Sequence, residues 1–425
     1  MHADDTHQTI EAVWRIESAK LIAALTRIVR GDVGLAEDLA HEALVAALEQ
    51  WPTEGVPDNP AAWLMSTAKR RAIDRLRHNK MVSQKHEELA RDLSPAIDPD
   101  LDSLDDPIGD DLLRLIFMTC HPVLSAESQA ALTLRLLGGL TTDEIARAFL
   151  TPEPTIAQRI VRAKRTLAEQ HVPFEVPRPH EMPQRLSSVL GVIYLIFNEG
   201  YSATAGDDWM RPALCEDAQR LARILAGLVP NEPEAHGLLS LLEIQASRTR
   251  ARTDASGNPI LLLDQNRAHW DQLLITRGLS ALQRAEALAN GTDNLGPYAL
   301  QASIAACHAR ARTPDQTDWP QIASLYARLH SISPSPIIQL NRAVAVSMAS
   351  GPEPALAIVD QLQNEPSLKN YHLLPSVRAD LLKKLGRLDE AKSEFHRAAS
   401  LTKNSRERAL LLQRAADCAN PAPRQ

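Results

Sequence analysis

The sequence has few aromatic residues, few cysteines and no long apolar segment. Aromatic residues make up 4% of the 425 residues, and the cysteines stand far apart, at Cys120, Cys215, Cys307 and Cys418. No CxxC pair occurs, so neither a disulfide framework nor a zinc site is indicated, and reduced thiols are expected. No run approaches the roughly 18 uninterrupted apolar residues of a membrane span, and no signal-peptide core stands at the N-terminus. We therefore expect a cytoplasmic protein with no membrane partner.

Net positive charge and catalytic motifs are also lacking. The formal charge of -7 excludes a uniformly basic coat for nucleic acid, so any contact with nucleic acid must come from local patches. The polar groups of the C-terminal half show no nucleophile–base spacing, no metal-ligand cluster and no phosphate-binding glycine loop. We expect hydrogen-bonded packing there, and thus no enzyme, no catalytic residue, no cofactor and no metal.

Alanine and leucine are abundant and runs of β-branched residues are absent, which predicts an all-α fold. The length suffices for two or three domains of roughly 100–200 residues each.

The most informative stretch is 141–168, which predicts two short helices separated by a tight turn. Thr141 and Glu144 form a capping box, and Pro152 and Pro154 mark the turn. The second helix, from about Thr155, has an apolar face and an opposite face rich in amide and basic groups. This pattern is typical of a helix-turn-helix that reads the major groove of DNA. An ordinary amphipathic hairpin with a solvated charged face is the alternative. The buried side of the second helix is predicted to hold Ile156, Ile160, Ala163 and Leu167.

Three helices are predicted before this hairpin. The first covers 10–30, and Asp32 caps the second, which Trp51-Pro52 should end. The segment 52–60 is dense in proline, glycine, aspartate and asparagine and is therefore expected to be a loop. The third helix starts near Pro60. Its second half is strongly basic, which indicates contact with a nucleic-acid backbone or a partner, or else a solvated surface.

The order of these motifs resembles a bacterial RNA polymerase sigma factor of the small extracytoplasmic-function group. The resemblance covers about 10–170 and rests on an AEDL-type second helix, a PxxWL start to the third, an AIDRLR run and the TxxEIA…RIVRAKRTL hairpin. The chain differs from the family at Glu153-Pro154, where a glycine is common. The resemblance implies core RNA polymerase and promoter DNA as partners and transcription initiation as the function.

The resemblance also implies roles for particular residues. The second helix would bind core polymerase through Glu37, Asp38, His41 and Glu42. The third helix and the loop before it would engage the minus-ten element through Asp58, Asn59, Lys69, Arg70, Arg75 and Arg77. The hairpin would read the minus-thirty-five element through Thr155, Gln158, Arg159, Arg162, Lys164 and Arg165.

The predicted domains are a melting and polymerase-binding domain at 8–80, an acidic flexible linker at 81–108 and a helix-turn-helix domain at 109–172. The linker region carries no Lys or Arg between residues 92 and 111 but eight aspartates, at Asp92, Asp98, Asp100, Asp102, Asp105, Asp106, Asp110 and Asp111. Such a composition builds no core, so the segment is expected to be a tether or to follow the basic nucleic-acid channel of polymerase.

The C-terminal part, 183–425, predicts helix after helix, beginning with an apolar helix from Val189 to Phe197 that Asn198–Gly200 should end. The segment 254–271 could be a short hairpin or an ordered loop. The polar groups expected to serve packing include Asp207 and Asp208, and His308 is expected in the core. The last helix pair of the C-terminal part fits the tetratricopeptide pattern at Ala379, Leu382, Gly386, Ala391, Phe395 and Ala398. The C-terminal part resembles the tetratricopeptide-like extension of one extracytoplasmic-function subgroup, for which we expect a regulatory role and a protein or ligand partner. Two alternatives stay open for the whole chain: a helix-turn-helix regulator with a tetratricopeptide sensor, and a helical scaffold protein.

Overall fold

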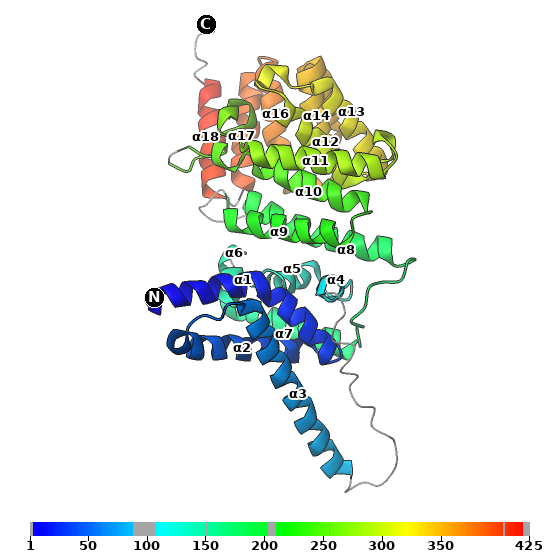
Figure 1. Ribbon diagram of the computed structural model, residues 1–425. Coiled ribbons are helices and arrows are strands. Elements are labelled where there is room, and N and C mark those ends of the chain that lie inside the picture. The colour runs from blue at the N-terminus through cyan, green and yellow to red at the C-terminus, as the bar shows by residue number, and fades with distance from the viewer. Residues whose placement is uncertain are drawn as a thin grey trace. The chain divides into compact units, whose positions relative to one another are not determined.

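The fold is all helical over the part of the chain that the structure describes, as predicted. This computed structural model describes residues 3–87, 108–149, 151–202, 210–254, 256–402 and 404–419. Within these ranges the only extended pairing is an isolated bridge between Thr253 and Pro259. The chain divides into two compact units, Met1–Ile193 and Tyr194–Gln425 (Figure 1).

The first unit contains two small helical bundles. The α1–α3 bundle consists of α1 (Ala3–Ile28), α2 (Val33–Glu54) and α3 (Pro60–Glu87). The α4–α7 bundle consists of α4 (Ile108–Thr119), α5 (Ala126–Leu136), α6 (Thr142–Ala148) and α7 (Glu153–Glu169). The first half of α8 (Met182–Tyr201) also belongs to this unit. There Arg185 donates to the carbonyl of Phe117 at 2.7 Å and Ser188 to that of Cys120 at 2.8 Å, which fixes the helix on α4.

Small residues hold the α1–α3 bundle together. Ala36, Ala40, Ala43 and Ala47 of α2 are completely buried. Their spacing of three and four residues places them on one face of the helix, where small side chains permit close approach of α1. As predicted, Asp32 caps α2, because its carboxylate accepts a hydrogen bond from the amide of Leu35 at 2.9 Å.

The predicted end of the second helix is wrong. Instead of stopping at Trp51-Pro52, α2 continues through Pro52 to Glu54, and its last turn is closed by Gly55 donating to the carbonyl of Trp51 at 3.0 Å. Pro52 is exposed, so the amide hydrogen bond that proline cannot make is lost in a turn that water can reach. The loop is therefore shorter than 52–60 and covers only 55–59.

The helix-turn-helix forms with its predicted cap. The amide of Thr141 donates to the carboxylate of Glu144 at 2.7 Å, and the amide of Glu144 donates back to the Thr141 hydroxyl at 3.2 Å. The α5–α6 turn requires Gly138, because a Cβ there would lie 2.4 Å from the carbonyl oxygen of Leu134. The second helix starts at Glu153, two residues before the predicted Thr155, with Pro154 in its first turn. Its predicted buried side is confirmed at Ile156, Ile160, Ala163 and Leu167.

The third helix runs to Glu87, into the segment that the sequence assigns to an acidic linker from 81. The rest of that segment, residues 88–107, lies outside the described residues. The predicted domain boundaries thus stay a prediction.

The second unit is a succession of helices in pairs. After the second half of α8 its helices are α9 (Pro212–Leu228), α10 (Pro233–Ala246), α11 (Gln272–Leu288), α12 (Pro297–Arg310), α13 (Trp319–Ile332), α14 (Pro336–Ser350), α15 (Pro352–Leu362), α16 (Leu373–Lys384), α17 (Leu388–Leu401) and α18 (Ser405–Ala419). Some of these helices approach each other closely at the backbone, as α10 and α12 do. A Cβ on Gly237 of α10 would lie 2.7 Å from the amide nitrogen of Ala299 in α12.

The tetratricopeptide-like pattern describes the α16–α17 pair correctly. Ala379, Leu382, Ala391, Phe395 and Ala398 are all completely buried. Gly386 turns the chain between the two helices with a φ of +79°, a conformation that favours glycine.

The apolar helix at the start of the C-terminal part ends later than predicted. The expected end at Asn198–Gly200 is wrong, since α8 continues to Tyr201. Gly200 has a packing role, because a Cβ there would lie 2.8 Å from the amide nitrogen of Cys215 in α9. In the segment 254–271, left open between a hairpin and an ordered loop, the described residues begin in a turn that the antiparallel bridge between Thr253 and Pro259 closes, and continue with 3-10 turns at Leu262–Asp264 and Arg267–His269.

Within the described residues, no helix combines the length and the apolar character that crossing a membrane would require.

Candidate nucleic-acid and protein interface

The polar face of α2 carries the predicted protein contacts, but its four residues differ in exposure. Asp38 is exposed and His41 and Glu42 are half-buried, whereas Glu37 is only 4% exposed. Glu42 accepts a hydrogen bond from Arg71 of α3 at 3.1 Å. Asp38, His41 and Glu42 are thus accessible to a partner, whereas the Glu37 side chain is buried within the protein.

The partners of Glu37 come from the α4–α7 bundle. Its carboxylate accepts a hydrogen bond from Nε of Arg135 in α5 at 2.6 Å and pairs with the ammonium of Lys164 in α7. Arg135 also donates to Nε2 of His41 at 3.1 Å, and Nδ1 of His41 donates to the Glu37 carbonyl at 2.8 Å. We call Glu37, His41, Arg135 and Lys164 the Glu37 cluster.

Electrostatics favour the ionised form of Glu37. Burial raises the pKa of this carboxyl, but the charges and hydrogen bonds of Lys164 and then Arg135 outweigh burial and lower the pKa overall. A carboxylate taken out of water needs such partners, so Glu37 is stable there only while the two cations stay in place.

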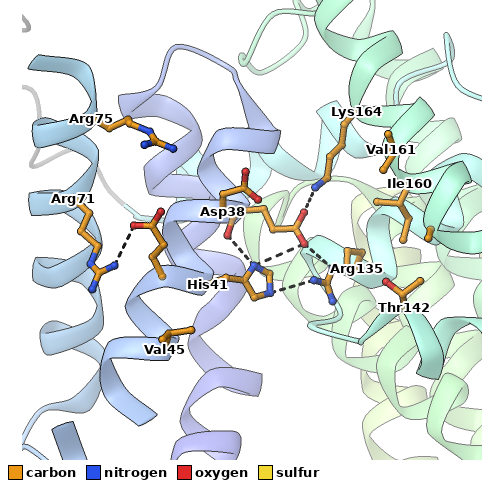
Figure 2. Close-up of a pocket in the computed structure, with 13 residues that line it drawn as sticks. Asp38, His41, Val45, Arg71, Arg75, Arg135, Thr142, Ile160, Val161 and Lys164 are labelled. Carbon is orange, nitrogen blue, oxygen red and sulfur yellow. Dashed lines mark hydrogen bonds and ion pairs between the residues drawn. The ribbon is translucent and has the colours of Figure 1, made fainter. Parts of the chain in front are cut away.

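A groove of about 600 Å³ opens beside this cluster. Figure 2 shows Arg71 and Arg75 of α3 on one side of it and Ile160, Val161 and Lys164 of α7 on the other. The contact between the bundles is therefore incompletely packed at this point.

The basic half of α3 presents its predicted cations to solvent. Arg70, Arg75 and Arg77 are exposed and Lys69 is half-buried. Arg70 and Arg77 are seven residues apart and so share one side of the helix. The side chains of α3 beyond residue 77, including His78 and Lys80, lie outside the described residues.

The loop before α3 holds Asp58 and Asn59, both exposed. Asn59 has a structural role that the sequence reading missed, since its side-chain oxygen accepts a hydrogen bond from the amide of Ala62 at 3.1 Å and caps α3. An asparagine immediately before a proline at a helix start was the available signal. Asp58 has no such role among the hydrogen bonds described for the loop.

The six residues of α7 that were predicted to contact DNA differ in exposure and in their partners. Thr155, Gln158, Arg162 and Arg165 are exposed, and Arg159 is half-buried. Arg165 pairs with Glu169 of the same helix at 2.6 Å. Lys164 differs from the others, because its ammonium lies on Glu37 rather than in solvent.

Arg135 was missed by the sequence reading. It interrupts the apolar run AALTLRLL of α5, and a lone charge in such a run signals a buried partner. The identity of that partner has no local signal, because Glu37 is 98 residues away in the chain.

The polar groups of the second unit serve packing where they are described. Arg267 donates to the carbonyls of His308 at 2.9 Å and Ala311 at 2.7 Å and so caps the end of α12. His308 is buried as predicted, and its ring meets Trp319 edge-on at 5.1 Å. Asp207 and Asp208, also noted from the sequence, lie outside the described residues.

Comparison with known proteins gives three family matches along the chain. Residues 16–81 match "Sigma-70 region 2", residues 114–167 match "Sigma-70, region 4", and residues 185–286 match a family of unknown function, DUF6596. The first match covers most of the α1–α3 bundle and the second most of the α4–α7 bundle.

Three relatives cover different shares of this chain. An ECF RNA polymerase sigma factor, SigK of Mycobacterium ulcerans (strain Agy99), is 30% identical over 153 residues, which is 35% of this chain and 78% of the relative. SigK of Mycobacterium sp. (strain KMS) is 28% identical over 148 residues, 33% of this chain and 72% of the relative. An uncharacterized protein of Rhizobium meliloti (strain 1021), R00370, is 44% identical over 392 residues, 92% of this chain and 91% of the relative.

Proposed function

This chain belongs to the extracytoplasmic-function (ECF) RNA polymerase sigma factors, and we propose that α2, α3 and α7 carry its contacts with polymerase and promoter. It is a sigma factor that binds core RNA polymerase and promoter DNA and initiates transcription. The observation that carries this function is the pair of separate sigma-70 matches, one on each bundle of the first unit.

The polymerase contact is assigned to the polar face of α2. Asp38, His41 and Glu42 are accessible in the structure, and Glu37 continues the same face. Acidic side chains on a rigid helix suit a basic partner surface, where they set the register and the rate of association.

The minus-ten contact is assigned to α3 and the loop 55–59. The cations Lys69, Arg70, Arg75 and Arg77 would hold the strand backbone, which makes the affinity sensitive to salt. Asp58 is the stronger candidate for a hydrogen bond to an extruded base, because the side-chain oxygen of Asn59 already caps α3.

The minus-thirty-five contact is assigned to α7. Thr155, Gln158, Arg159 and Arg162 lie on or next to its exposed face and would meet base edges, while Lys164 and Arg165 would meet phosphates. Such a factor acts by binding and positioning, so it catalyses no covalent step itself. Its place of action would be the cytoplasm, where polymerase and chromosome are.

The second unit would regulate this activity through a protein or ligand partner. Its stacked helix pairs are of the kind that provides extended binding surfaces. Arg185 and Ser188 of α8 bind the carbonyls of Phe117 and Cys120 at the end of α4, so a deletion that tests this role must keep α8. Removing everything after Ser202 should alter promoter output in cells, and unchanged output under every condition tried would rule the role out.

Run-off transcription with purified core polymerase tests the function. Adding this chain to core polymerase and genomic fragments should yield defined start sites. The double variant Arg70→Gln/Arg75→Gln should weaken initiation strongly, whereas Arg387→Gln, which breaks an exposed pair with Glu390 in α17, should not. Absence of a defined start on every fragment would refute the sigma function.

A further inference from the structure

Three arginines and two aromatic rings alternate in the second unit, beside the ends of α8 and α10. The guanidinium carbon of Arg252 lies 3.5 Å from the ring centroid of Tyr201, and that of Arg248 lies 5.8 Å from the same centroid. Arg248 also lies over the ring of Trp270 at 5.7 Å, and Arg267 lies over that ring at 5.1 Å. Three like charges are thus gathered around two ring faces, each of which attracts cations.

Two of these arginines have a structural role that explains their position. Arg252 donates to the carbonyl of Tyr201 at the end of α8, and Arg267 donates to two carbonyls at the end of α12. Arginines near helix C-termini satisfy carbonyls that lack a partner inside the helix. This role does not account for Arg248, whose hydrogen bonds go to the Tyr201 hydroxyl at 2.7 Å and to the side chain of Gln245.

Several buried N–H groups of this cluster have no hydrogen-bond partner within the described part of the chain. They are Nε of Arg248, Nε of Arg267 and Nε1 of Trp270. Trp270 is 3% exposed and Arg267 is 9% exposed. A buried donor without an acceptor is unfavourable, and native proteins contain few of them. Since these groups only donate, and two of them belong to cations, an anion with several acceptor atoms would satisfy them.

The local electrostatics favour the same class of ligand. The hydrogen bonds of Arg248 and Arg267 go to neutral groups among the described residues. Burial first, and then the charge of Arg248, lower the pKa of Arg267. The pKa of His308 falls to about 3 through burial, followed by the charges of Arg248 and Arg267. An anion beside Arg248 would relieve this repulsion between like charges.

We propose that Arg248, Arg267 and Trp270 form a binding site for a small oxyanion, namely the phosphate or carboxylate group of a small molecule. The planar fork of a guanidinium matches the oxygens of both groups. Arg248 and Tyr201 are half-buried and give access from solvent, whereas the burial of Arg267 and Trp270 limits the site to a single anionic group. The proposal rests on the proposed function in one respect, because it names the class of ligand through which the second unit would act.

Hydrogen exchange of the full chain tests the site where it lies. The amides of Ala251, Trp270 and Asp271 donate hydrogen bonds within this region, so they exchange when it opens. Inorganic phosphate at tenfold its dissociation constant should slow their exchange about tenfold relative to chloride at equal ionic strength. A parallel series with acetate distinguishes a carboxylate ligand from a phosphate one, and protection by either anion supports the site.

Matched variants assign the protection to this cluster. Arg248→Gln removes the central charge and should weaken anion binding about tenfold or more. Arg250→Gln is the control, because Arg250 is exposed two residues further along, and it should bind as the wild type does. Arg248 also holds Tyr201, so two further variants separate a lost site from a disturbed fold. Arg248→Lys keeps the charge without the fork and should bind with intermediate affinity, and Trp270→Phe keeps a ring without the N–H and should bind more weakly.

Two results would overturn the site. One is unchanged exchange of these amides with both phosphate and acetate. The other is protection that persists undiminished in both Arg248→Gln and Trp270→Phe. Run-off transcription by the wild type would still stand in either case, because the exchange experiment contains no polymerase or DNA. Absence of defined start sites together with intact anion protection would instead refute the proposed function and leave the site in place.

Discussion

The two units of this protein join their helices by different chemistry. In the first unit, the α1–α3 and α4–α7 bundles meet at the buried carboxylates Glu37 and Asp111, with an open groove beside one of them. In the second unit, neighbouring helices meet through glycine, alanine and completely buried apolar side chains such as Phe395, and charge pairs such as Arg223 with Glu243 between α9 and α10 add to that packing. A charged contact is lost when one partner is exchanged for another, whereas a close-packed apolar contact is lost only with the fold.

The largest expected effect is a break in the apolar packing of the second unit. Phe395 of α17 is completely buried in the core that α16 and α17 share, and Phe395→Ala should lower the free energy of unfolding by about 3–5 kcal/mol. Denaturant unfolding of the full chain, followed by helicity, measures this. Leu412→Ala is the control, because Leu412 is 44% exposed and should change the stability little. Equal effects of both substitutions would contradict the close-packed description.

A second effect is pH-dependent stability of the same unit. Burial, followed by the positive charges of Arg248 and Arg267, lowers the pKa of His308 to about 3. The unfolded chain, with an ordinary histidine pKa near 6.5, binds more protons below that pH than the folded one. The free energy of unfolding should therefore fall as the pH drops from 6.5 toward 3, by about 1.4 kcal/mol per pH unit once below 6.5.

Measurement between pH 6.5 and 5 separates this effect from carboxylate titration. His308→Gln should flatten the dependence in that range. An equally steep dependence in the variant would show that another group is responsible.

A smaller effect is expected from the helix-turn-helix cap. Thr141→Ala removes the hydroxyl that accepts the amide of Glu144, at a cost of about 1 kcal/mol to the α4–α7 bundle. Hydrogen exchange of α6 amides should rise. Exchange in α16 should stay as in the wild type, and a rise there too would mean that the effect is not local.

The smallest effect concerns a single surface cation. Arg165→Gln should leave the melting temperature unchanged, since the pair with Glu169 is exposed. If Arg165 contacts a phosphate, the slope of log affinity for promoter DNA against log salt should fall by about one in magnitude. An unchanged slope would remove Arg165 from the DNA contact.

Local signals in the sequence were sufficient for much of the fold. The capping box at Thr141 and Glu144, the cap at Asp32 and the buried face of α7 depend on residues within a few turns of one another, and all three are present. Rules applied to single residues failed where packing decided the outcome. Pro52 lies inside α2 rather than ending it, and Gly200 serves the approach of α9 rather than a helix end.

The candidate site was predictable residue by residue but not as an arrangement. Most of the residues singled out on α3 and α7 are exposed, as a binding face requires. Glu37 and Lys164 were both assigned to outside partners, and only the three-dimensional structure places them on each other across 127 residues of chain. Contacts between distant segments depend on how the bundles pack, which no local pattern encodes.

Run-off transcription by core RNA polymerase with and without this chain tests the central claim, the sigma function, most directly. The account predicts defined start sites on genomic fragments only when the chain is added, and a strong loss of them in Arg70→Gln/Arg75→Gln. Transcription with no defined start site on any fragment would contradict it.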